Sequence, residues 1–428
     1  MPIGKYMYSL AEELFPICRS ITGDGVRQTL EIIKREIPEL NIYEVPTGTQ
    51  VFDWTVPKEW NIKGGYIETM EGKRILDFSN SNLHIMGYSL PMDKIVTKQE
   101  LLDMVYSLPE QPEYIPYVTS YYKERSGFCM SENQKQSLVD REYHVVIDSS
   151  LEDGFLTYGE LLIPGESQEE IFLSTYICHP SMANNELSGP VVAIALAKYI
   201  LANKRKKYSY RIIFIPETIG SITYLSQNLE YMQKHVIAGY NISCVGDDRT
   251  YSYIESPYAN TLADRVAQNV LHFHYPEFKR YSFLHRGSDE RQYCSPLVNL
   301  PLCAICRSKY EEYPEYHTSA DNLSIISPKG LTGAYEVYRQ CIELIENNNR
   351  YIVTTPCEPQ LGKRGLYPTI SQKGSINDTR KMTSLIAYCN GKNDLVDISN
   401  IINVSAAELI PIIKKLLSVD LICYAKNE

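Results

Sequence analysis

The chain has 428 residues, of which 44% are hydrophobic and 22% are charged. This composition is that of an ordinary globular protein, and it excludes an intrinsically disordered, collagen-like or coiled-coil chain. The formal net charge of -10 at pH 7 argues against a protein that binds nucleic acid or an anionic membrane, because both are bound chiefly through Lys and Arg. A chain of this length predicts two or three domains.

The sequence shows no sign of a membrane span or of secretion. It has no run of about 18 apolar residues, and its first residues lack the basic and apolar regions of a secretory signal. We therefore expect a cytoplasmic protein. The 11 cysteines are scattered through apolar segments, as expected of reduced thiols. Cys303 and Cys306 have C-x-x-C spacing, but without a second pair this favours a buried strand over a zinc knuckle.

The chain begins with a helical pattern, after which its composition and hydrophobic pattern change. Apolar residues at helical spacing in residues 8–35, interrupted at 20–25, predict two helices joined by a tight loop. Residues 41–133 are rich in Pro and Tyr and alternate in short runs, which predicts an inserted, mostly β domain. From residue 143 strands alternate with helices, which predicts a wound α/β sheet built from residues 1–40 and 134–352.

The α/β segment predicts strands whose ends are candidate site positions. The predicted strands are 171–178, 211–216, 238–246 and 302–306, and the predicted helices are 190–204, 221–234, 261–274 and 330–347. Open α/β sheets bind ligands beyond the carboxyl ends of their strands. The loops at His179, Glu217 and Asp247 are therefore the places to look for a site.

The C-terminal segment predicts a winged helix-turn-helix domain at residues 366–428. A linker containing Gly, Pro and Ser extends from residue 356 to about 377. Ser405 and Glu408 have the spacing of a capping box before an apolar helical run, and a shorter helix at 396–402 precedes them. Lys and Arg exceed Asp and Glu by only two from residue 356 onward, which favours packing or partner binding over DNA binding.

Three loops carry residues that can bind a metal or transfer protons. His179 follows the first of these strands, and Asn185 and Glu186 lie just before the next helix; they are either metal ligands or residues that cap the turn and the helix. Glu217 leaves an apolar strand, where partial burial suits a general base, although it is equally well placed as a surface residue at a helix start. His317 is either a second imidazole ligand or an ordinary loop histidine.

A fourth candidate is the loop at residues 286–291. Asp289 or Glu290 could hold a substrate amine, and Arg291 a carboxylate. The same residues could equally form a surface ion pair of little energetic weight.

These motifs together resemble the di-zinc aminopeptidase superfamily, which includes secreted bacterial aminopeptidases and glutaminyl cyclases. The resemblance covers roughly residues 143–348 and rests on His179, residues 184–189 (NNELSG), 216–220 (PETIG) and 316–322 (YHTSADN). It implies an aminopeptidase-like (phosphorylase/hydrolase-like) mixed sheet with helices on both faces.

A closer resemblance spans nearly the whole chain. Residues 15–23 (FPICRSITG), 51–60 (VFDWTVPKEW) and 177–181 (ICHPS) are similar to a bacterial aminopeptidase-like family with an inserted β domain and a C-terminal winged helix. Genes of that family often lie near surface-polysaccharide genes.

The resemblance implies roles for individual residues. It makes His179 a ligand of one metal, His317 a ligand of the other, and Glu217 the base that activates a water molecule for amide hydrolysis. The chain departs from the superfamily where Asn185 replaces the metal-bridging aspartate, for which Glu186 could substitute, and where Thr218 replaces a second glutamate. Asp247 is the best available carboxylate for the remaining ligand.

Lost carboxylates weaken a two-metal site, so we expect a single zinc ion per chain at most, with one or no ion favoured over two. The leading hypothesis is a zinc-dependent aminopeptidase-like hydrolase that cleaves an amide or peptide-like bond in a small substrate. The first alternative is a ligand-binding or scaffold protein with an altered site. The second is an amidase that acts on an N-acyl sugar in polysaccharide biosynthesis. A homo-oligomer is expected from base rates alone.

Overall fold

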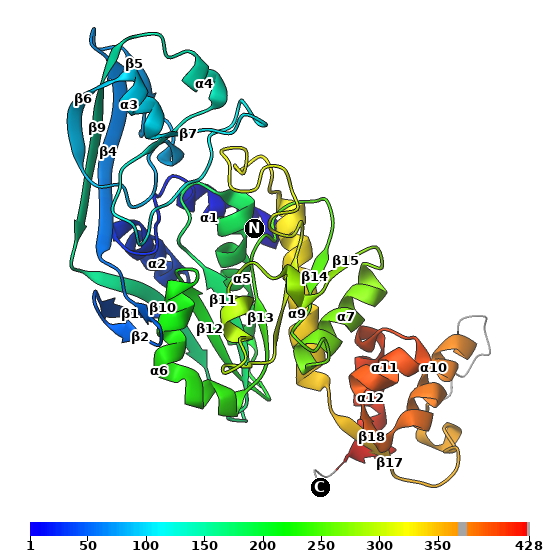
Figure 1. Ribbon diagram of the computed structural model, residues 1–428. Coiled ribbons are helices and arrows are strands. Elements are labelled where there is room, and N and C mark those ends of the chain that lie inside the picture. The colour runs from blue at the N-terminus through cyan, green and yellow to red at the C-terminus, as the bar shows by residue number, and fades with distance from the viewer. Residues whose placement is uncertain (367–374, 426–428) are drawn as a thin grey trace. The chain divides into compact units, whose positions relative to one another are not determined.

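The computed structural model describes residues 1–366 and 375–425 (Figure 1). The chain forms two compact units. The first consists of Met1–Pro257 and Lys279–Tyr335, and the second of Tyr258–Phe278 and Glu336–Glu428.

An eight-stranded mixed sheet forms the centre of the first unit, in the order β1-β10-β12-β11-β13-β16-β14-β15. Its four inner strands, β12, β11, β13 and β16, are parallel, whereas β1 and β10 are antiparallel to their neighbours. In the order of the sheet, the strands are β1 (Asn41–Pro46), β10 (Phe155–Ile163), β12 (Ser209–Ile215), β11 (Glu170–Tyr176), β13 (Val236–Asn241), β16 (Leu302–Cys306), β14 (Ser252–Ile254) and β15 (Lys279–Tyr281).

Helices cover both faces of this sheet (Figure 1). Tyr158 and Gly159 of β10 point to opposite faces, because successive side chains of a strand alternate. The Tyr158 hydroxyl donates to Gln227 of α6, while Gly159 lies against Leu30 of α2. All residues of β11 are buried, as expected for a parallel strand between two helical layers. The helices of the first unit are α1 (Ile3–Leu14), α2 (Asp24–Glu36), α5 (Ser188–Ala202), α6 (Ile219–His235), α8 (Glu290–Tyr293) and the start of α9 (Pro328–Asn347).

The predicted α/β class and its main elements are confirmed. The strand predicted at 302–306 is β16, and the other predicted helices and strands lie within a few residues of the observed ones. One difference matters for the site. β13 ends at Asn241, well before Asp247, because Cys244 adopts a left-handed backbone (φ 53°) that a strand cannot contain.

A four-stranded antiparallel sheet, in the order β5-β4-β9-β6, lies beside the main sheet in the first unit (Figure 1). Its strands are β4 (Glu59–Thr69), β5 (Arg74–Asp77), β6 (Met92–Thr97) and β9 (Glu142–Glu152). Short pairs β2 (Gln50–Val51) with β3 (Trp54–Thr55) and β7 (Val105–Tyr106) with β8 (Phe128–Cys129) accompany it, with helices α3 (Lys98–Asp103) and α4 (Glu132–Gln136). Relative to the insert predicted at 41–133, β1 joins the main sheet and β9 joins the smaller one.

The second unit contains a three-stranded sheet, β18-β17-β19, with helices packed around it. Its strands are β17 (Arg350–Val353), β18 (Asn390–Asp394) and β19 (Ile422–Tyr424), and its helices are α7 (Leu262–His274), the end of α9, α10 (Ser375–Tyr388), α11 (Leu395–Ile402) and α12 (Ala406–Ser418). Arg265 of α7 donates to Asp394 and Asp397 at 2.7 Å, which fixes α7 to the start of α11.

The capping box predicted at Ser405 and Glu408 is wrong. The Ser405 hydroxyl makes no cap bond and lies 3.3 Å from Nε2 of His274, so a contact with α7 replaces the local one. A capping box is present instead one helix earlier, between Asp394 and Asp397. The predicted linker at 356–377 includes residues 367–374, which lie outside the described residues.

Among the described residues, no single helix has the length and apolar character needed to cross a bilayer. The bent pair of α11 and α12, at 117°, reaches the required length and composition only when both helices are taken together.

Candidate active site

The candidate site lies where two inner parallel strands of the main sheet end. Cys178 and His179 follow β11, and Glu217 follows β12. His317 comes from the long loop between β16 and α9. His179, Glu217 and His317 line one cavity of about 330 Å³. The structure therefore brings together three side chains that are far apart in the sequence.

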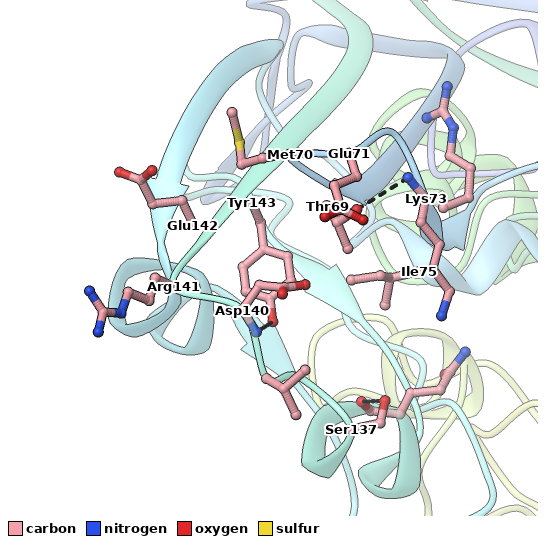
Figure 2. Close-up of a pocket in the computed structure, with 13 residues that line it drawn as sticks. Thr69, Met70, Glu71, Lys73, Ile75, Ser137, Asp140, Arg141, Glu142 and Tyr143 are labelled. Carbon is pink, nitrogen blue, oxygen red and sulfur yellow. Dashed lines mark hydrogen bonds between the residues drawn. The ribbon is translucent and has the colours of Figure 1, made fainter.

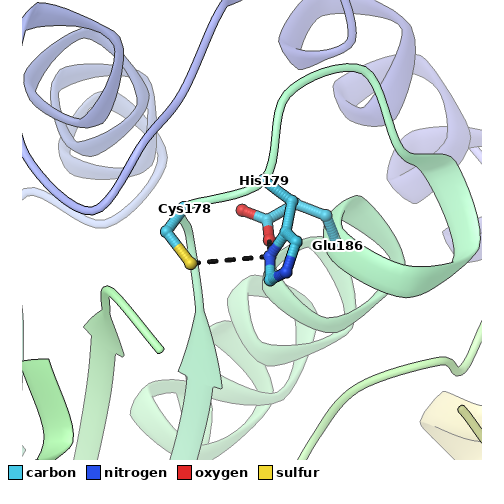
Figure 3. A group of neighbouring side chains, drawn as sticks. All are labelled: Cys178, His179 and Glu186. Carbon is cyan, nitrogen blue, oxygen red and sulfur yellow. Dashed lines mark hydrogen bonds and ion pairs between the residues drawn. The ribbon is translucent and has the colours of Figure 1, made fainter. Parts of the chain in front are cut away.

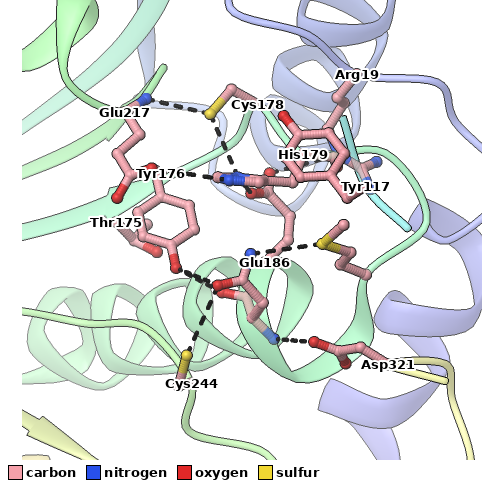
Figure 4. A network of polar contacts seen from close by, with 12 residues as sticks. Arg19, Tyr117, Thr175, Tyr176, Cys178, His179, Glu186, Glu217, Cys244 and Asp321 are labelled. Carbon is pink, nitrogen blue, oxygen red and sulfur yellow. Dashed lines mark hydrogen bonds and ion pairs between the residues drawn. The ribbon is translucent and has the colours of Figure 1, made fainter. Parts of the chain in front are cut away.

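His179 is held by a carboxylate on one side of its ring and faces a second on the other. Its Nδ1 lies 2.9 Å from Oε2 of Glu186, and its Nε2 lies 3.7 Å from Oε2 of Glu217 (Figure 4). Burial, together with the positive charge of Arg19, lowers the pKa of His179 to about 3. The ring is therefore neutral at pH 7.

Glu186 lies in a single π-helical turn, Ala183–Leu187, directly before α5. Its side chain is fully buried, and burial raises its pKa to about 8 against the opposing effect of Arg19. Arg19 Nε lies 3.5 Å from Oε1 of Glu186 and donates to the His179 carbonyl oxygen at 3.0 Å. Arg19 thus partly offsets the effect of burial on the Glu186 carboxyl group behind His179 (Figure 4).

Glu217 is the carboxylate that faces the cavity. Its side chain retains 20% exposure, whereas Asp289 beside it is fully buried. Burial and the nearby Asp289 carboxylate both raise the pKa of Glu217. Its backbone N–H donates to Sγ of Cys178 at 3.2 Å, which ties the end of β12 to the end of β11. A carboxyl group with a raised pKa suits general acid and base catalysis.

His317 approaches His179 from the opposite loop. The two ring centroids are 5.4 Å apart, and burial, with a contribution from His179, lowers the pKa of His317 to about 3. Tyr316 stacks on the His317 ring at 3.9 Å. Within residues 1–366 and 375–425, the buried Nε2 of His317 has no hydrogen-bond partner. A buried nitrogen of this kind usually costs stability and calls for a functional explanation.

Left-handed backbone conformations cluster around the site. Thr218 has φ 63°, His317 has φ 56°, and Ser181 has φ 46°. Such conformations are strained for residues with a side chain and are concentrated at functional sites. These strained conformations indicate that the arrangement of the three loops is kept for function.

In two of the predicted metal ligands, the side-chain oxygens already accept hydrogen bonds from protein groups. The Asn185 amide oxygen accepts from the Tyr176 hydroxyl at 3.0 Å. Asp247 accepts from the backbone and hydroxyl of Ser308, from the Arg249 backbone and from the Asn184 amide. Asp247 is also absent from the residues that line the cavity.

The predicted substrate-binding residues separate into two groups. Asp289 accepts from the Thr218 backbone and the Ser221 hydroxyl, and Glu290 accepts from Gly287, Ser288, Tyr310 and Asn241. Both carboxylates are buried inside the protein. Arg291, in contrast, is exposed and lines the cavity.

Among the described residues, one set of donors near His179 has its ligand atoms close enough together to hold a metal ion. Cys178, His179 and Glu186 place ligand atoms within 4.8 Å of one another (Figure 3). Burial raises the pKa of Cys178 well above its usual value, and Arg19 contacts Glu186, so both conditions disfavour a cation there. On the cavity side, His179 lies beside His317, with ring centroids 5.4 Å apart, and beside Glu217, whose Oε2 is 3.7 Å from His179 Nε2.

A separate cavity of about 680 Å³ lies next to strands β4, β5 and β9 (Figure 2). Its wall alternates in charge: Lys73, Arg74 and Arg141 against Glu71, Asp140 and Glu142. The buried Tyr143 in this wall has its hydroxyl engaged by the backbone N–H of Asp140 at 2.9 Å. The cavity at His179 is therefore the stronger candidate for an active site.

Several contributors to the site were missed by sequence reasoning. Arg19 stands inside the motif at residues 15–23, but its burial against Glu186 has no local signal. Asp321 accepts the backbone N–H groups of Asn184 and Asn185, and so orders the turn before α5. Trp54 also comes from a distant segment, and it forms an aromatic wall with Tyr122.

Comparisons with known proteins agree with this architecture. Residues 8–348 match the family model described as "Domain of unknown function (DUF4910)", and residues 349–424 match a winged helix-turn-helix model. The chain belongs to the DUF4910 family. A Clostridium acetobutylicum relative is 48% identical over 92% of this chain and 91% of its own length. Its name describes a polysaccharide biosynthesis protein with an aminopeptidase-like domain.

Solved structures show the same fold. A crystal structure from C. acetobutylicum, described as a candidate peptidase, has a TM-score of 0.93 and 45% identity, over 98% of this chain and 96% of that one. A zinc aminopeptidase from Bacillus subtilis has a TM-score of 0.58 at 11% identity, over 80% and 94%. An Aneurinibacillus aminopeptidase has a TM-score of 0.52 at 12% identity, over 80% and 93%. The DUF4910 chain therefore has an aminopeptidase-like α/β fold and a C-terminal winged helix.

Proposed function

We propose that this DUF4910 protein is a zinc-dependent hydrolase that cleaves an amide or peptide-like bond, with Glu217 as the general base. The observation that carries the proposal is the position of His179 between two carboxylates. Its Nε2 lies 3.7 Å from Glu217 in the cavity, while its Nδ1 is held 2.9 Å from Glu186 behind it.

In this proposal His179 and His317 would hold one zinc ion, and Glu217 is left free as the base. A neutral imidazole that carries its proton on Nδ1 keeps its Nε2 lone pair for a metal, and Nδ1 of His179 lies 2.9 Å from Glu186. The buried Nε2 of His317, which lacks a partner within the described ranges, offers a second nitrogen ligand. The side-chain oxygens of Asn185 and Asp247 already accept hydrogen bonds from protein groups. The ligands that remain therefore favour one metal ion over two. When bound, zinc would supply Lewis-acid polarisation of the amide carbonyl.

Glu217 would carry the proton through the reaction. Its carboxylate takes a proton from water as the water oxygen attacks the carbonyl carbon. The resulting carboxylic acid then donates that proton to the amide nitrogen as the C–N bond breaks. One water is consumed, and a carboxylic acid and an amine are formed. The raised pKa of Glu217 suits both directions of transfer near neutral pH.

A second candidate is a ligand-binding protein on a catalytically altered scaffold. It is favoured by Thr218, which stands where the resembled superfamily has a carboxylate, and by the engagement of Asn185 with Tyr176. An amidase acting on an N-acyl sugar is the third, and it is supported by the name of the 48% identical relative. A cytoplasmic location remains our expectation.

Hydrolysis of aminoacyl amides and N-acyl sugars by the zinc-loaded full-length protein tests the proposal. We expect Glu217→Gln to lower kcat by about 10²–10⁴-fold, because the water loses its base. Glu230→Gln is the matched control, since Glu230 is exposed on α6, the helix that follows Glu217. Full activity in Glu217→Gln, or no hydrolysis of either class by the wild type, would favour the binding-protein alternative.

A further inference from the structure

Arg291 is a cation in the wall of the candidate active site. It lies on the one-turn helix α8 and lines the same cavity as His179, Glu217 and His317. Its Nη2 donates to the Thr218 hydroxyl at 2.8 Å, which holds the guanidinium beside the end of β12. In residues 1–366 and 375–425, no carboxylate forms an ion pair with it within 4.0 Å.

The acidic residues next to Arg291 do not offer a site for a substrate cation. Asp289 is fully buried and accepts from Thr218 and Ser221. Glu290 is buried, and both of its oxygens accept from protein donors. Glu217 is the carboxylate that remains in the cavity, and the proposed function uses it as the base. A substrate ammonium near Arg291 would therefore meet a positive charge with no carboxylate set aside for it.

The cavity also has an aromatic wall supplied by the smaller β structures. Trp54 of β3 and Tyr122 lie edge to face with centroids 5.5 Å apart, and their side chains are 39% and 55% exposed. Behind them, the hydroxyls of Tyr117 and Tyr121 share a hydrogen bond of 2.7 Å. Exposed rings of this kind bind the apolar face of a ring or of a large side chain.

We propose that the site selects small amides that carry an anionic group, a carboxylate or a phosphate, and that it disfavours substrates with a free α-ammonium. Arg291 binds the anion through charge-assisted hydrogen bonds, while Trp54 and Tyr122 contact an apolar or ring face of the same molecule. The bond to be cleaved and the exclusion of Glu217 as a partner for a substrate ammonium rest on the proposed function, whereas the binding of an anion by Arg291 does not. This substrate class differs from that of an enzyme that recognises a free peptide N-terminus.

Calorimetric titration of the full-length, zinc-loaded protein with three matched probes tests this selection. The probes are N-acetyl-tyrosine, which is anionic, N-acetyl-tyrosinamide, which is neutral, and tyrosinamide, which is cationic. We expect N-acetyl-tyrosine to bind about tenfold more tightly than the neutral probe, and tyrosinamide to bind most weakly. Comparing N-acetylglucosamine with its 6-phosphate extends the test to a phosphate anion. A preference for the anion in either pair supports the proposal.

Two variants assign the preference to Arg291. Arg291→Gln should bring the anionic and neutral probes to nearly equal affinity, whereas Arg291→Lys should retain part of the preference because it keeps the charge. Arg291 is exposed, so both variants should melt at the temperature of the wild type. A preference unchanged in Arg291→Gln would overturn the assignment.

The experiments give different results when the anion-selection proposal fails and when the hydrolase proposal fails. A clear charge preference together with no hydrolysis of aminoacyl amides or N-acyl sugars would count against the hydrolase proposal and leave anion selection standing. Equal affinities for the anionic and neutral probes, or no binding of any probe at millimolar concentration, would overturn anion selection whether or not a substrate is cleaved.

Discussion

Two buried charged clusters stand at opposite ends of the same parallel strands, and they differ in how completely they are paired. At the start of β11 and β12, Arg211 donates to Glu160 and Glu170 at 2.6 Å, and the Tyr224 hydroxyl completes the group. At the carboxyl ends, the Arg19, His179 and Glu217 cluster leaves buried polar atoms without partners in the described residues. These atoms include Arg19 Nη2, Glu186 Oε1, His317 Nε2 and Asp289 Oδ2.

The difference separates a structural cluster from a functional one. A buried network in which every charge is paired rigidifies the fold, whereas unpaired buried groups cost stability and persist where a ligand or a reaction uses them. The raised pKa of Glu217 and the left-handed backbone at Thr218 and His317 are, like the unpaired buried groups, features that cost stability and are typical of functional sites. This contrast is what the proposed hydrolase role predicts for the cluster at the carboxyl ends of the strands.

The largest expected effect comes from breaking the paired cluster. Arg211→Met leaves Glu160 and Glu170 buried without their cation, so we expect the free energy of unfolding to fall by about 3–5 kcal/mol. Chemical denaturation followed by tryptophan fluorescence measures this change, because Trp54 and Trp60 both lie in the first unit. A loss below about 1 kcal/mol would show that the pairing is not structural.

A substitution in the cluster at the carboxyl ends of the strands should raise the free energy of unfolding rather than lower it. Glu217→Gln removes a carboxylate that is desolvated and repelled by Asp289, so we expect the zinc-free protein to gain about 0.5–2 kcal/mol at pH 7. The same denaturation measurement applies, with Glu230→Gln as the control. Destabilisation by Glu217→Gln would place Glu217 among the structural residues.

The pH dependence of stability sharpens this contrast. The raised pKa means that folded Glu217 keeps its proton at pH values above 4.5, where the unfolded chain has already lost it. Rising pH therefore favours the unfolded state, and stability falls through this range. Denaturation midpoints in the presence of a chelator should fall less steeply with pH in Glu217→Gln than in the wild type. Parallel slopes would mean that Glu217 titrates normally.

A smaller effect is expected from Asp289→Asn. The asparagine oxygen can still accept from Thr218 and Ser221, but the negative charge that raises the pKa of Glu217 is gone. The ascending limb of kcat/KM against pH should therefore move to lower pH. An unchanged pH profile would mean that burial alone sets the pKa of Glu217.

The smallest effect belongs to a surface pair. Arg35 and Glu13 are about half exposed, and Arg35→Ala should change the free energy of unfolding by less than about 1 kcal/mol. The same denaturation assay measures it. A loss as large as that of Arg211→Met would remove the distinction between buried and exposed pairs.

The sequence predicts the site residues that follow the strands, and it misses those that reach the site through contacts between distant parts of the chain. His179 and Glu217 were identifiable because strong apolar runs mark β11 and β12, and the residues after such strands meet at one edge of the sheet. The burial of Arg19 against Glu186 depends on a contact 167 positions along the chain, for which the local pattern carries no signal. The aromatic wall at Trp54 arises in the same way.

Errors in the fold have local causes. β17 and β18 were not predicted, because they are short and because β18 (NGKND) is polar and reads as a turn. The Ser405 capping box failed because a tertiary contact with His274 replaced the local bond. Asp247 was expected at a strand end, but β13 stops earlier, and Ser308 and Asn184 engage the carboxylate.

Metal content per chain is the most direct test of the central claim that the unpaired cluster is a zinc site. Elemental analysis of protein purified without a histidine tag or chelator should give about one zinc per chain. The metal should be lost in a His179→Ala, His317→Ala double variant and retained in His272→Ala, an exposed control. Retention in Cys178→Ser would exclude the Cys178, His179 and Glu186 set. Absence of zinc from the wild type after zinc is added back, or its retention in the double variant, would contradict the account.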